Sequence, residues 1–306
     1  MRRGSPTQAS ALILVMWALV VMSLAVFGVI RFVAYGFDDT VALAKDFRAR
    51  QLADSGLAIG LHPLVKPGDP VLRQELPSGE KITVRIRPED GRLPINVILS
   101  LGYSDVLREL FEQWGLEPED ALILEDSLVD WVDAGSRPRM HGAERDYYET
   151  LGYPQYPRNR PFETVEEMLP VRGMDKLLEV KPDWRDYFTV HGSGKLNVNG
   201  ASADAISIYT KVPRDQAEAL VMMRNGLDGL PDTEDDLPFS SLEQFRNALG
   251  TSPGDFNGVA GLLTVETTLL RVESRGFVGN RSVTLSMIAK LEKGKRPVIL
   301  ESMENQ

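Results

Sequence analysis

The hydrophobic positions follow three different patterns along the chain, and the first is an unbroken apolar run. Residues 11–30, ALILVMWALVVMSLAVFGVI, contain no charge and no proline. An α-helix rises about 1.5 Å per residue, so a run of this length spans the roughly 30 Å hydrocarbon core of a bilayer. Arg2 and Arg3 precede the run, and the first acid after it is Asp38. The positive-inside rule therefore places the amino terminus in the cytoplasm and the rest of the chain outside.

Three kinds of segment share this composition. A cleaved secretory signal has a shorter apolar region of about 7–15 residues and a small-residue cut after it, which this chain lacks. A plain signal anchor and a signal that is cut before its apolar run both remain open. The second of these fits the short basic leader MRRGSPTQA, with a cut between Ala9 and Ser10.

The second pattern is helical and begins where the apolar run ends. Leu43, Phe47 and Leu52 recur near helical spacing between charged residues, so we expect one long helix over 10–61, half of it in lipid. Prolines at 63, 67 and 70 then break the helix. Helical spacing returns in a large block and predicts helices over 105–114, 119–132, 165–168, 174–178, 203–209, 214–225 and 241–249.

The third pattern is the alternation of β-strands, on both sides of the helical block. It predicts strands over 80–87, 265–274 and 282–291, with a short further strand at 93–98. The fold class is therefore α+β, with a helical domain inserted between strands of one sheet. The predicted parts are a leader (1–9), a membrane-spanning helix (10–61), an α/β domain (62–98 and 262–291), the inserted domain (99–261) and a loose polar tail (292–306).

The amino-acid composition argues against several classes of function. The net charge of −10 and the pI near 5.0 argue against nucleic-acid binding, which needs a basic surface. The absence of Cys excludes disulfides, zinc thiolates and cysteine nucleophiles. The three His residues have no metalloenzyme spacing. We find no nucleophile–base set, and no pair of acids stands out as a catalytic dyad.

Clustered carboxylates are the main candidate chemistry. The first cluster follows a predicted helix and comprises Asp130, Asp133, Glu144 and Asp146. Ca²⁺ takes 6–8 oxygen ligands, many of them from carboxylates and carbonyls in a loop. This cluster is therefore a candidate calcium site, and a capped helix end with a Trp and two Tyr in the core is the alternative.

A second acidic cluster lies in a Gly/Pro-rich loop. Its members are Asp228, Asp232, Glu234, Asp235 and Asp236. Like charges this close repel one another, and a divalent cation would relieve the repulsion. The spacing is not that of an EF-hand, and a solvated acidic loop is the alternative.

An ordered set of motifs gives a further indication of identity. The set comprises SALILVMWALVVMSL, LVDWVDAGSRPRMHGAERDYY, KLNVNGASADAI, PFSSLEQF and LLRVESRGF. In this order the motifs resemble the type II secretion system minor pseudopilin K family (general secretion pathway protein K), over nearly the whole chain. The resemblance implies a pseudopilin α/β domain with a large inserted helical domain.

The same resemblance implies how the chain is processed, where it lies and which proteins it binds. Prepilin peptidase would cut after Ala9, where the family usually has Gly, and would methylate the amine of Ser10. Leu14 stands at the fifth mature position, where most pilins have Glu, as is usual in the K family. The implied product is a structural, non-enzymatic subunit of the bacterial inner membrane with a periplasmic ectodomain. It would cap the pseudopilus tip, help to start its assembly for protein export across the outer membrane, and bind the I-type and J-type minor pseudopilins and the major pseudopilin.

The resemblance also bears on calcium. It implies a Ca²⁺ site in the helical domain, although Gly135 and Arg145 replace two expected acids. Two other functions remain open, a type IV pilus-like minor pilin and a membrane-anchored periplasmic hydrolase that uses acidic residues.

Overall fold

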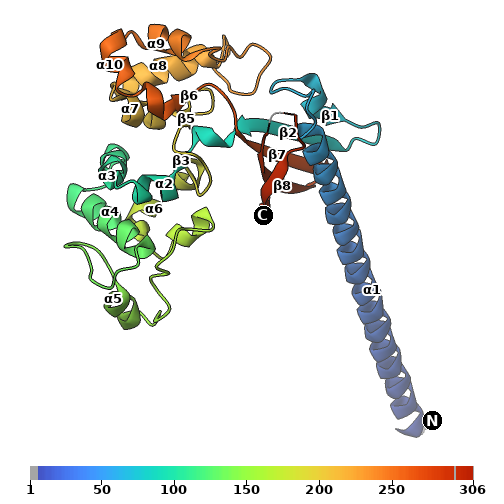
Figure 1. The fold of residues 1–306 in the computed structure, drawn as a ribbon. Coiled ribbons are helices and arrows are strands. Elements are labelled where there is room, and N and C mark those ends of the chain that lie inside the picture. The colour runs from blue at the N-terminus through green and yellow to red at the C-terminus, as the bar shows by residue number, and fades with distance from the viewer. Residues whose placement is uncertain (1–5, 293, 306) are drawn as a thin grey trace.

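The computed structural model describes the backbone of residues 6–292 and 294–305, and the side chains except those of 6–12, 32–40, 255 and 305. Its dominant element is helix α1 (Pro6–Gly60). Figure 1 shows α1 as a long rod that leaves the rest of the molecule and carries the amino terminus at its far end. The compact part of the molecule consists of a β-sheet and a helical unit.

The sheet has five antiparallel strands in the order β1-β2-β7-β8-β9. The strands are β1 (Arg73–Glu75), β2 (Lys81–Pro88), β7 (Leu269–Val278), β8 (Arg281–Lys290) and β9 (Val298–Asn305). Strand β2 pairs with β7 from far along the chain, with Lys81 opposite Phe277 and Pro88 opposite Leu270. The predicted α+β class is therefore confirmed, and the helical unit is inserted between β2 and β7.

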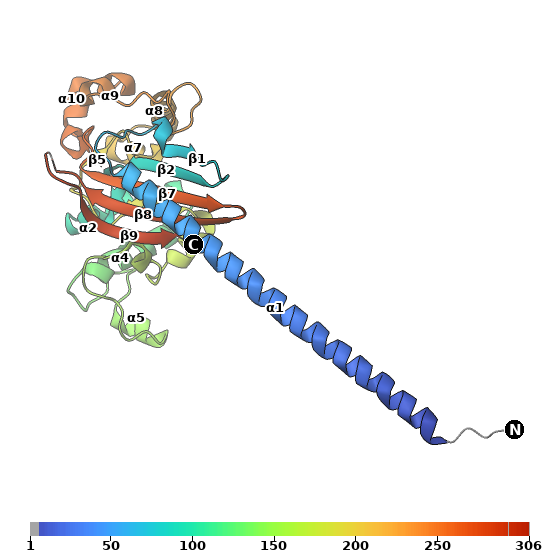
Figure 2. The ribbon, with the colours of Figure 1, turned by 90° about the vertical axis from the view of Figure 1, so that its right-hand side faces the viewer.

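The last turns of α1 lie across one face of this sheet, as Figure 2 shows. The buried face of α1 carries residues at helical spacing, among them Ala49, Leu52, Ala53 and Leu57. Their small members let the helix approach closely. A Cβ at Gly276 of β7 would overlap the main chain of α1 at Ala49, so glycine at this position is what permits the contact.

Ion pairs flank this contact on the surface. The Arg48 guanidinium binds both carboxylate oxygens of Glu80, with a closest approach of 2.9 Å, and Arg50 contacts Glu304 at 2.5 Å. Exposed pairs of this kind contribute about 0–1 kcal/mol each. The apolar contact between α1 and the sheet therefore provides most of the stabilisation.

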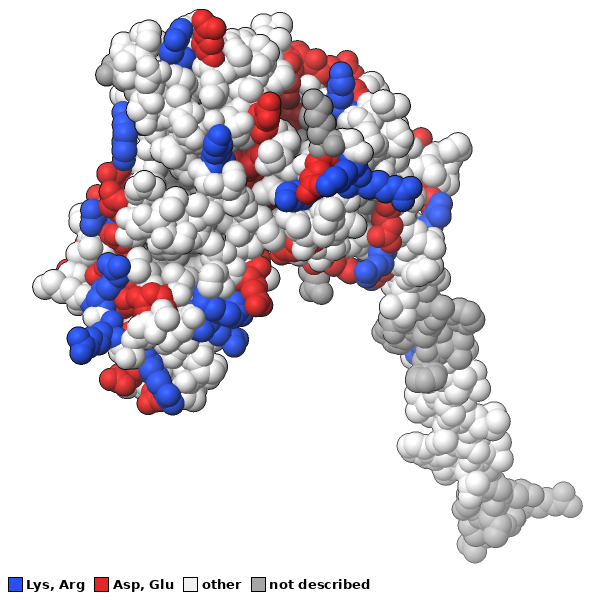
Figure 3. Space-filling view, viewed as in Figure 1, with Lys and Arg blue, Asp and Glu red and all other residues white. Residues whose placement is uncertain are grey.

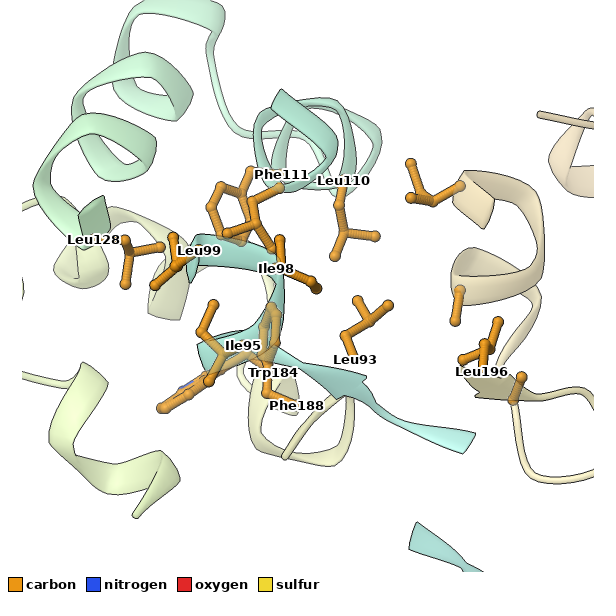
Figure 4. Packing of buried hydrophobic residues seen from close by; sticks show 14 of the residues in the cluster. Leu93, Ile95, Ile98, Leu99, Leu110, Phe111, Leu128, Trp184, Phe188 and Leu196 are labelled. Atoms are coloured by element: carbon orange, nitrogen blue, oxygen red, sulfur yellow. The ribbon is translucent and has the colours of Figure 1, made fainter. Parts of the chain in front are cut away.

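The helical unit has its own, larger hydrophobic core. Its α-helices are α2 (Ile95–Ser100), α3 (Ser104–Gln113), α4 (Pro118–Val132), α5 (Arg145–Thr150), α6 (Met174–Val180), α7 (Ala203–Thr210), α8 (Arg214–Arg224), α9 (Leu242–Leu249) and α10 (Pro253–Asn257). Figure 4 shows Trp184 beside Phe188 in this core. The ring centroid of Phe188 lies 6.4 Å from those of both Trp184 and Phe111, and all three side chains are fully buried. Short 3₁₀ helices lie at Pro70–Leu72, Glu89–Gly91, Val165–Met168, Trp184–Asp186 and Ala260–Leu262.

Two short parallel ladders connect the segments inside the helical unit. Strand β3 (Leu93–Pro94) pairs with β4 (Phe188–Thr189), and β5 (Leu196–Asn197) pairs with β6 (Leu263–Thr264). The short strand predicted at 93–98 is therefore only partly right, because α2 begins at Ile95.

The chain passes between the two units twice, and buried polar contacts join the passages. Glu89 is fully buried and binds the Arg271 guanidinium through two hydrogen bonds of 2.6 and 2.9 Å. Asp90 accepts hydrogen bonds from the backbone N–H and the hydroxyl of Thr268, at 2.9 and 3.0 Å. These contacts fix how the helical unit sits on the sheet.

The prediction of a loose tail over 292–306 is wrong. Strand β9 continues the sheet along β8, with a bulge between Ile288 and Ala289. The outer edge of β8 offers unpaired N–H and C=O groups, and main-chain pairing does not require a strongly apolar segment. The polar composition of the tail therefore concealed the strand.

Candidate membrane anchor and carboxylate clusters

Helix α1 combines a segment of membrane-crossing length and apolarity with a segment that docks on the sheet, without interruption. Among the described residues, Ile13–Arg31 is the one stretch long and apolar enough to cross a membrane, and none of it is buried in the molecule. The family-implied position of a pilin Glu is occupied by Leu14, whose side chain is 71% exposed. A carboxylate there would be costly in lipid, whereas Leu14 is compatible with it. The proposed processing residues Ala9 and Ser10 lie within α1, and their side chains are outside the described part.

An exposed apolar pair, Leu43 and Phe47, lies on α1 beyond the long apolar run. The two residues are one helical turn apart and are 70% and 64% exposed, although Ala49 is fully buried against the sheet. The pair therefore points away from the molecule's own sheet, and Val41, which is 51% exposed, lies on a different face of the helix. Apolar side chains four residues apart are suited to packing against another helix.

The first carboxylate cluster lies between α4 and α5, and we call Asp130, Asp133, Glu144 and Asp146 the α4–α5 cluster. Asp130 is fully buried, and its carboxylate accepts a hydrogen bond of 3.0 Å from the backbone N–H of Arg139. Glu144 is also buried, and its Oε1 has no hydrogen-bond partner among the described residues. Asp133 accepts from the N–H of Gly135 at 2.7 Å, and Asp146 is exposed on α5.

Burial and mutual repulsion oppose ionisation in the α4–α5 cluster. Burial, with the charges of Asp130 and Asp133, raises the pKa of Glu144 above its usual range. Burial likewise raises the pKa of Asp130, with a further contribution from Asp133. Three of the four predicted residues are therefore close enough to influence one another.

Ca²⁺ is bound by carboxylate oxygens, and it would compensate carboxylates that are buried, repel one another and lack hydrogen bonds, as in this cluster. Their spacing is wider than that of a metal site, because no three acidic or histidine side chains in the described part of the chain come together as ligands. Calcium at the α4–α5 cluster therefore stays a prediction.

The second predicted cluster forms a self-bonded loop, residues 225–238, which we call the acidic loop. The Asp235 carboxylate accepts from the backbone N–H groups of Leu227 and Asp228, at 2.6 and 3.1 Å. The Asp236 carboxylate accepts from the N–H of Asp232 at 2.8 Å. The hydroxyl of Thr233 lies 2.8–3.4 Å from oxygens of Asp228, Asp235 and Asp236.

These hydrogen bonds offset the repulsion between the loop's acids. The hydroxyl of Thr233 and the backbone N–H groups lower the pKa of Asp235. Asp232 pairs with Arg87 of β2 at 2.7 Å, which also ties the loop to the sheet. Glu234 is exposed. The acidic loop thus satisfies its own charges with backbone donors, and calcium binding at this loop also stays a prediction.

A cleft of about 950 Å³ separates the sheet from the helical unit. Arginines and acids line it together, and several of the acids are held in ion pairs. Glu89 is bound by Arg271, Asp232 by Arg87, and Asp186 lies 3.5 Å from Arg92.

The contacts at this joint were not predicted from the sequence. Glu89 and Asp90 lie in a turn after a strand, Arg271 lies within the strand of the motif LLRVESRGF, and their partners are remote in the chain. Two adjacent acids directly after a predicted strand are the one sequence signal that Glu89 and Asp90 offered.

Comparison with known proteins bears on the helical unit first. The family model described as "Type II secretion system (T2SS), protein K" matches residues 99–179. Type II secretion system protein K of Dickeya chrysanthemi is 37% identical over 75 residues, which are 24% of this chain and 20% of that protein. The Klebsiella pneumoniae protein of the same name is 35% identical over 75 residues, which are 24% of this chain and 23% of that protein. The alignment thus spans less than a quarter of either relative.

The whole fold has a solved counterpart. A chain of the crystal structure of the GspK-GspI-GspJ complex from the enterotoxigenic Escherichia coli type 2 secretion system matches with a TM-score of 0.61. The match covers 89% of this chain and 99% of that chain, at 15% identity. The resemblance to protein K that the ordered motifs indicated is therefore confirmed. Residues 99–179 of this chain thus match the type II secretion system protein K family model, in a molecule that shares the fold of a chain of that complex.

Proposed function

We propose that this protein is a minor pseudopilin of a type II secretion system that caps the tip of the pseudopilus and helps to start its assembly. The carrying observation is helix α1, which runs unbroken from an exposed apolar segment of membrane length to a docked position on the sheet. A subunit built in this way is anchored in the bilayer and can be drawn into a helical bundle with neighbouring subunits.

The helical unit and Leu14 support the proposal that the protein lies at the tip of the pseudopilus. Figure 1 shows the helical unit as a wide body at the opposite end of the molecule from the amino terminus. Such bulk leaves little room for another subunit above the sheet. Leu14 also lacks the carboxylate with which a pilin would pair the amine of a neighbouring subunit.

The proposed partners follow from the same surfaces. The exposed pair of Leu43 and Phe47 would pack against the helices of the I-type and J-type minor pseudopilins and, lower in the filament, of the major pseudopilin. Prepilin peptidase would process the chain between Ala9 and Ser10 and methylate Ser10. The anchor would lie in the bacterial inner membrane with the ectodomain in the periplasm, and the role would be structural rather than enzymatic.

A Ca²⁺ ion at the α4–α5 cluster is part of the proposal. The orphaned Oε1 of Glu144 and the buried carboxylate of Asp130 would supply oxygen ligands, and the ion would neutralise charges that now repel each other. Its role would be to hold the loop between α4 and α5 in place.

The decisive experiment combines maturation and assembly. The N-terminal mass of the protein from its native membrane should correspond to a chain that begins with methylated Ser10. Purified with the I-type and J-type subunits, the mature protein should form a ternary complex, and Leu43→Glu with Phe47→Glu should abolish it. Leu64→Glu, at another exposed apolar position, is the matched control. A chain that begins at Met1 and forms no complex would reject the proposal.

A further inference from the structure

The strongest unexplained surface of the molecule lies at the end of α8 and on the acidic loop. Met222 and Met223 are 65% and 54% exposed, and Leu227, Leu230 and Leu237 are 100%, 60% and 64% exposed. We call these five residues the Met–Leu surface. Exposed apolar residues that occur singly need no explanation, but five large ones within sixteen positions form a concentration that is typical of interaction sites.

The loop that carries the leucines is ordered by its own polar groups. The backbone N–H of Leu237 donates to the carbonyl of Arg224 at 2.7 Å and closes the loop at its base. Inside the loop, carboxylates of Asp228, Asp235 and Asp236 accept backbone and Thr233 hydrogen bonds. The polar side chains thus hold the loop together while the leucines face solvent. In most folded segments the apolar side chains lie inside and the polar side chains face solvent.

A preformed apolar surface costs little conformational entropy when a partner covers it. The two methionines add flexible, polarisable side chains that adapt to different apolar shapes. Order in the loop and adaptability beside it are both favourable for docking.

The charge around the Met–Leu surface selects the kind of partner. Residues 225–238 contain five acids and no Lys or Arg. Arg87 neutralises Asp232, whereas Asp228 and Glu234 are exposed. Figure 3 shows acidic side chains gathered at the upper edge of the molecule, where Figure 1 places this loop. A partner with Lys or Arg next to its apolar residues would therefore be attracted, and an acidic partner repelled.

We propose that the Met–Leu surface docks a protein segment in which apolar side chains are flanked by Lys or Arg. A second copy of this chain is a poor occupant, because its own surface would bring five further acids against the first five. The Met–Leu surface belongs to the helical unit and α1 does not contribute to it, so docking here leaves the helix available for assembly. The inference thus goes beyond the proposed function and holds independently of it.

The test uses the full-length chain in nanodiscs of zwitterionic lipid, with empty nanodiscs as the background. Three labelled peptides of equal length serve as probes: Leu and Lys at helical spacing, Leu and Glu at the same spacing, and Ser and Lys. The Leu/Lys peptide should bind, and the other two should bind at least about tenfold more weakly. The Leu/Glu peptide carries negative instead of positive charge, and the Ser/Lys peptide has no apolar side chains. Hydrogen–deuterium exchange should slow within residues 222–237.

The matched variants separate this surface from general attraction to an acidic protein. Leu227→Ser with Leu230→Ser should weaken Leu/Lys peptide binding at least about tenfold, which follows from the loss of two apolar side chains at the contact. Leu64→Ser with Leu101→Ser removes leucines that are 81% and 60% exposed elsewhere, and should leave the affinity unchanged. Both double variants should still form the complex with the I-type and J-type subunits.

Three results would overturn the inference. One is an equal loss of affinity in both double variants, and another is equal binding of the Leu/Lys and Ser/Lys peptides. The third is self-association of the wild-type chain that Leu227→Ser with Leu230→Ser abolishes, which would make a second copy the occupant. Failure of the wild-type chain to form the ternary complex would instead count against the proposed assembly role.

Discussion

The close approach of α1 to the sheet makes Gly276 the most informative position for a single substitution. A Cβ at this position would overlap the carbonyl oxygen of Ala49 and would lie 2.8 Å from both the backbone nitrogen of Ala53 and the Cβ of Leu52. Two of these three atoms belong to the main chain of α1, so a rotamer change cannot relieve the clash. Gly276→Ala must therefore push the helix away from β7 or bend the strand.

The size of the effect can be bounded. Overpacking a well-packed interface costs about 1–3 kcal/mol, and rigid backbone neighbours place this case toward the upper end. For a protein of about this size, each kcal/mol lowers the melting temperature by roughly 2–4 °C. We therefore expect Gly276→Ala to lower the melting transition of the sheet by about 4–12 °C.

The assay is thermal unfolding of the full-length chain in nanodiscs, with hydrogen exchange of β7 and β8 to identify the transition. Gly261→Ala is the matched control, because a Cβ there meets no atom within 4 Å and should leave the melting temperature nearly unchanged. If Gly276→Ala melted with the control and β7 exchanged no faster, the argued closeness of α1 and β7 would be refuted.

Three further substitutions or conditions test separate parts of the structure. Ala9→Leu should block removal of the leader, because the cut needs a small residue, and mass spectrometry that finds the normal mature mass would contradict this. Ca²⁺ at 100 times its dissociation constant should stabilise the chain by about 2.7 kcal/mol at pH 7.5. Folding raises the pKa values of Asp130 and Glu144, so their negative charges lower the free energy of unfolding. This destabilisation is fully present above the folded-state pKa values and absent below the unfolded-state value of about 4. The Ca²⁺ effect on the melting temperature should therefore vanish near pH 4, and a melting temperature unaffected by EDTA at pH 7.5 would contradict the site. Glu89→Ala should destabilise by about 3–5 kcal/mol in urea unfolding, because Arg271 is left buried and unpaired, whereas Glu75→Ala at an exposed pair should cost about 1 kcal/mol or less.

Much of the fold was predictable because its signals are local. The apolar run and the spacing of Leu52 and its neighbours predict α1, and the alternation through Ile82, Val84 and Ile86 predicts β2. The break between the strands predicted over 265–274 and 282–291 correctly separates β7 from β8. These patterns reflect one buried face per element, which the sequence records directly.

Features that depend on remote partners were not predictable in the same way. Strand β9 lacks the alternating pattern of a half-buried strand and pairs because β8 offers an edge, and Asp90 is fixed by Thr268 from the other side of the inserted unit. In the acidic loop the sequence shows the crowding of charges, but not that Thr233 and backbone N–H groups offset it. The sequence of the α4–α5 cluster indicated carboxylates in proximity, and it did not indicate which of them are buried.

The pairing of β2 with β7 has a consequence for how the protein is made. Glu89 and Arg271, which flank this pairing, are 182 residues apart in the chain. Chains emerge from the amino terminus, so α1 is complete long before its covering sheet exists. The helical unit, whose contacts lie within one continuous segment, can fold in the meantime. Until β7 is made, the apolar face of α1 and the edge of β2 that pairs with β7 stay uncovered.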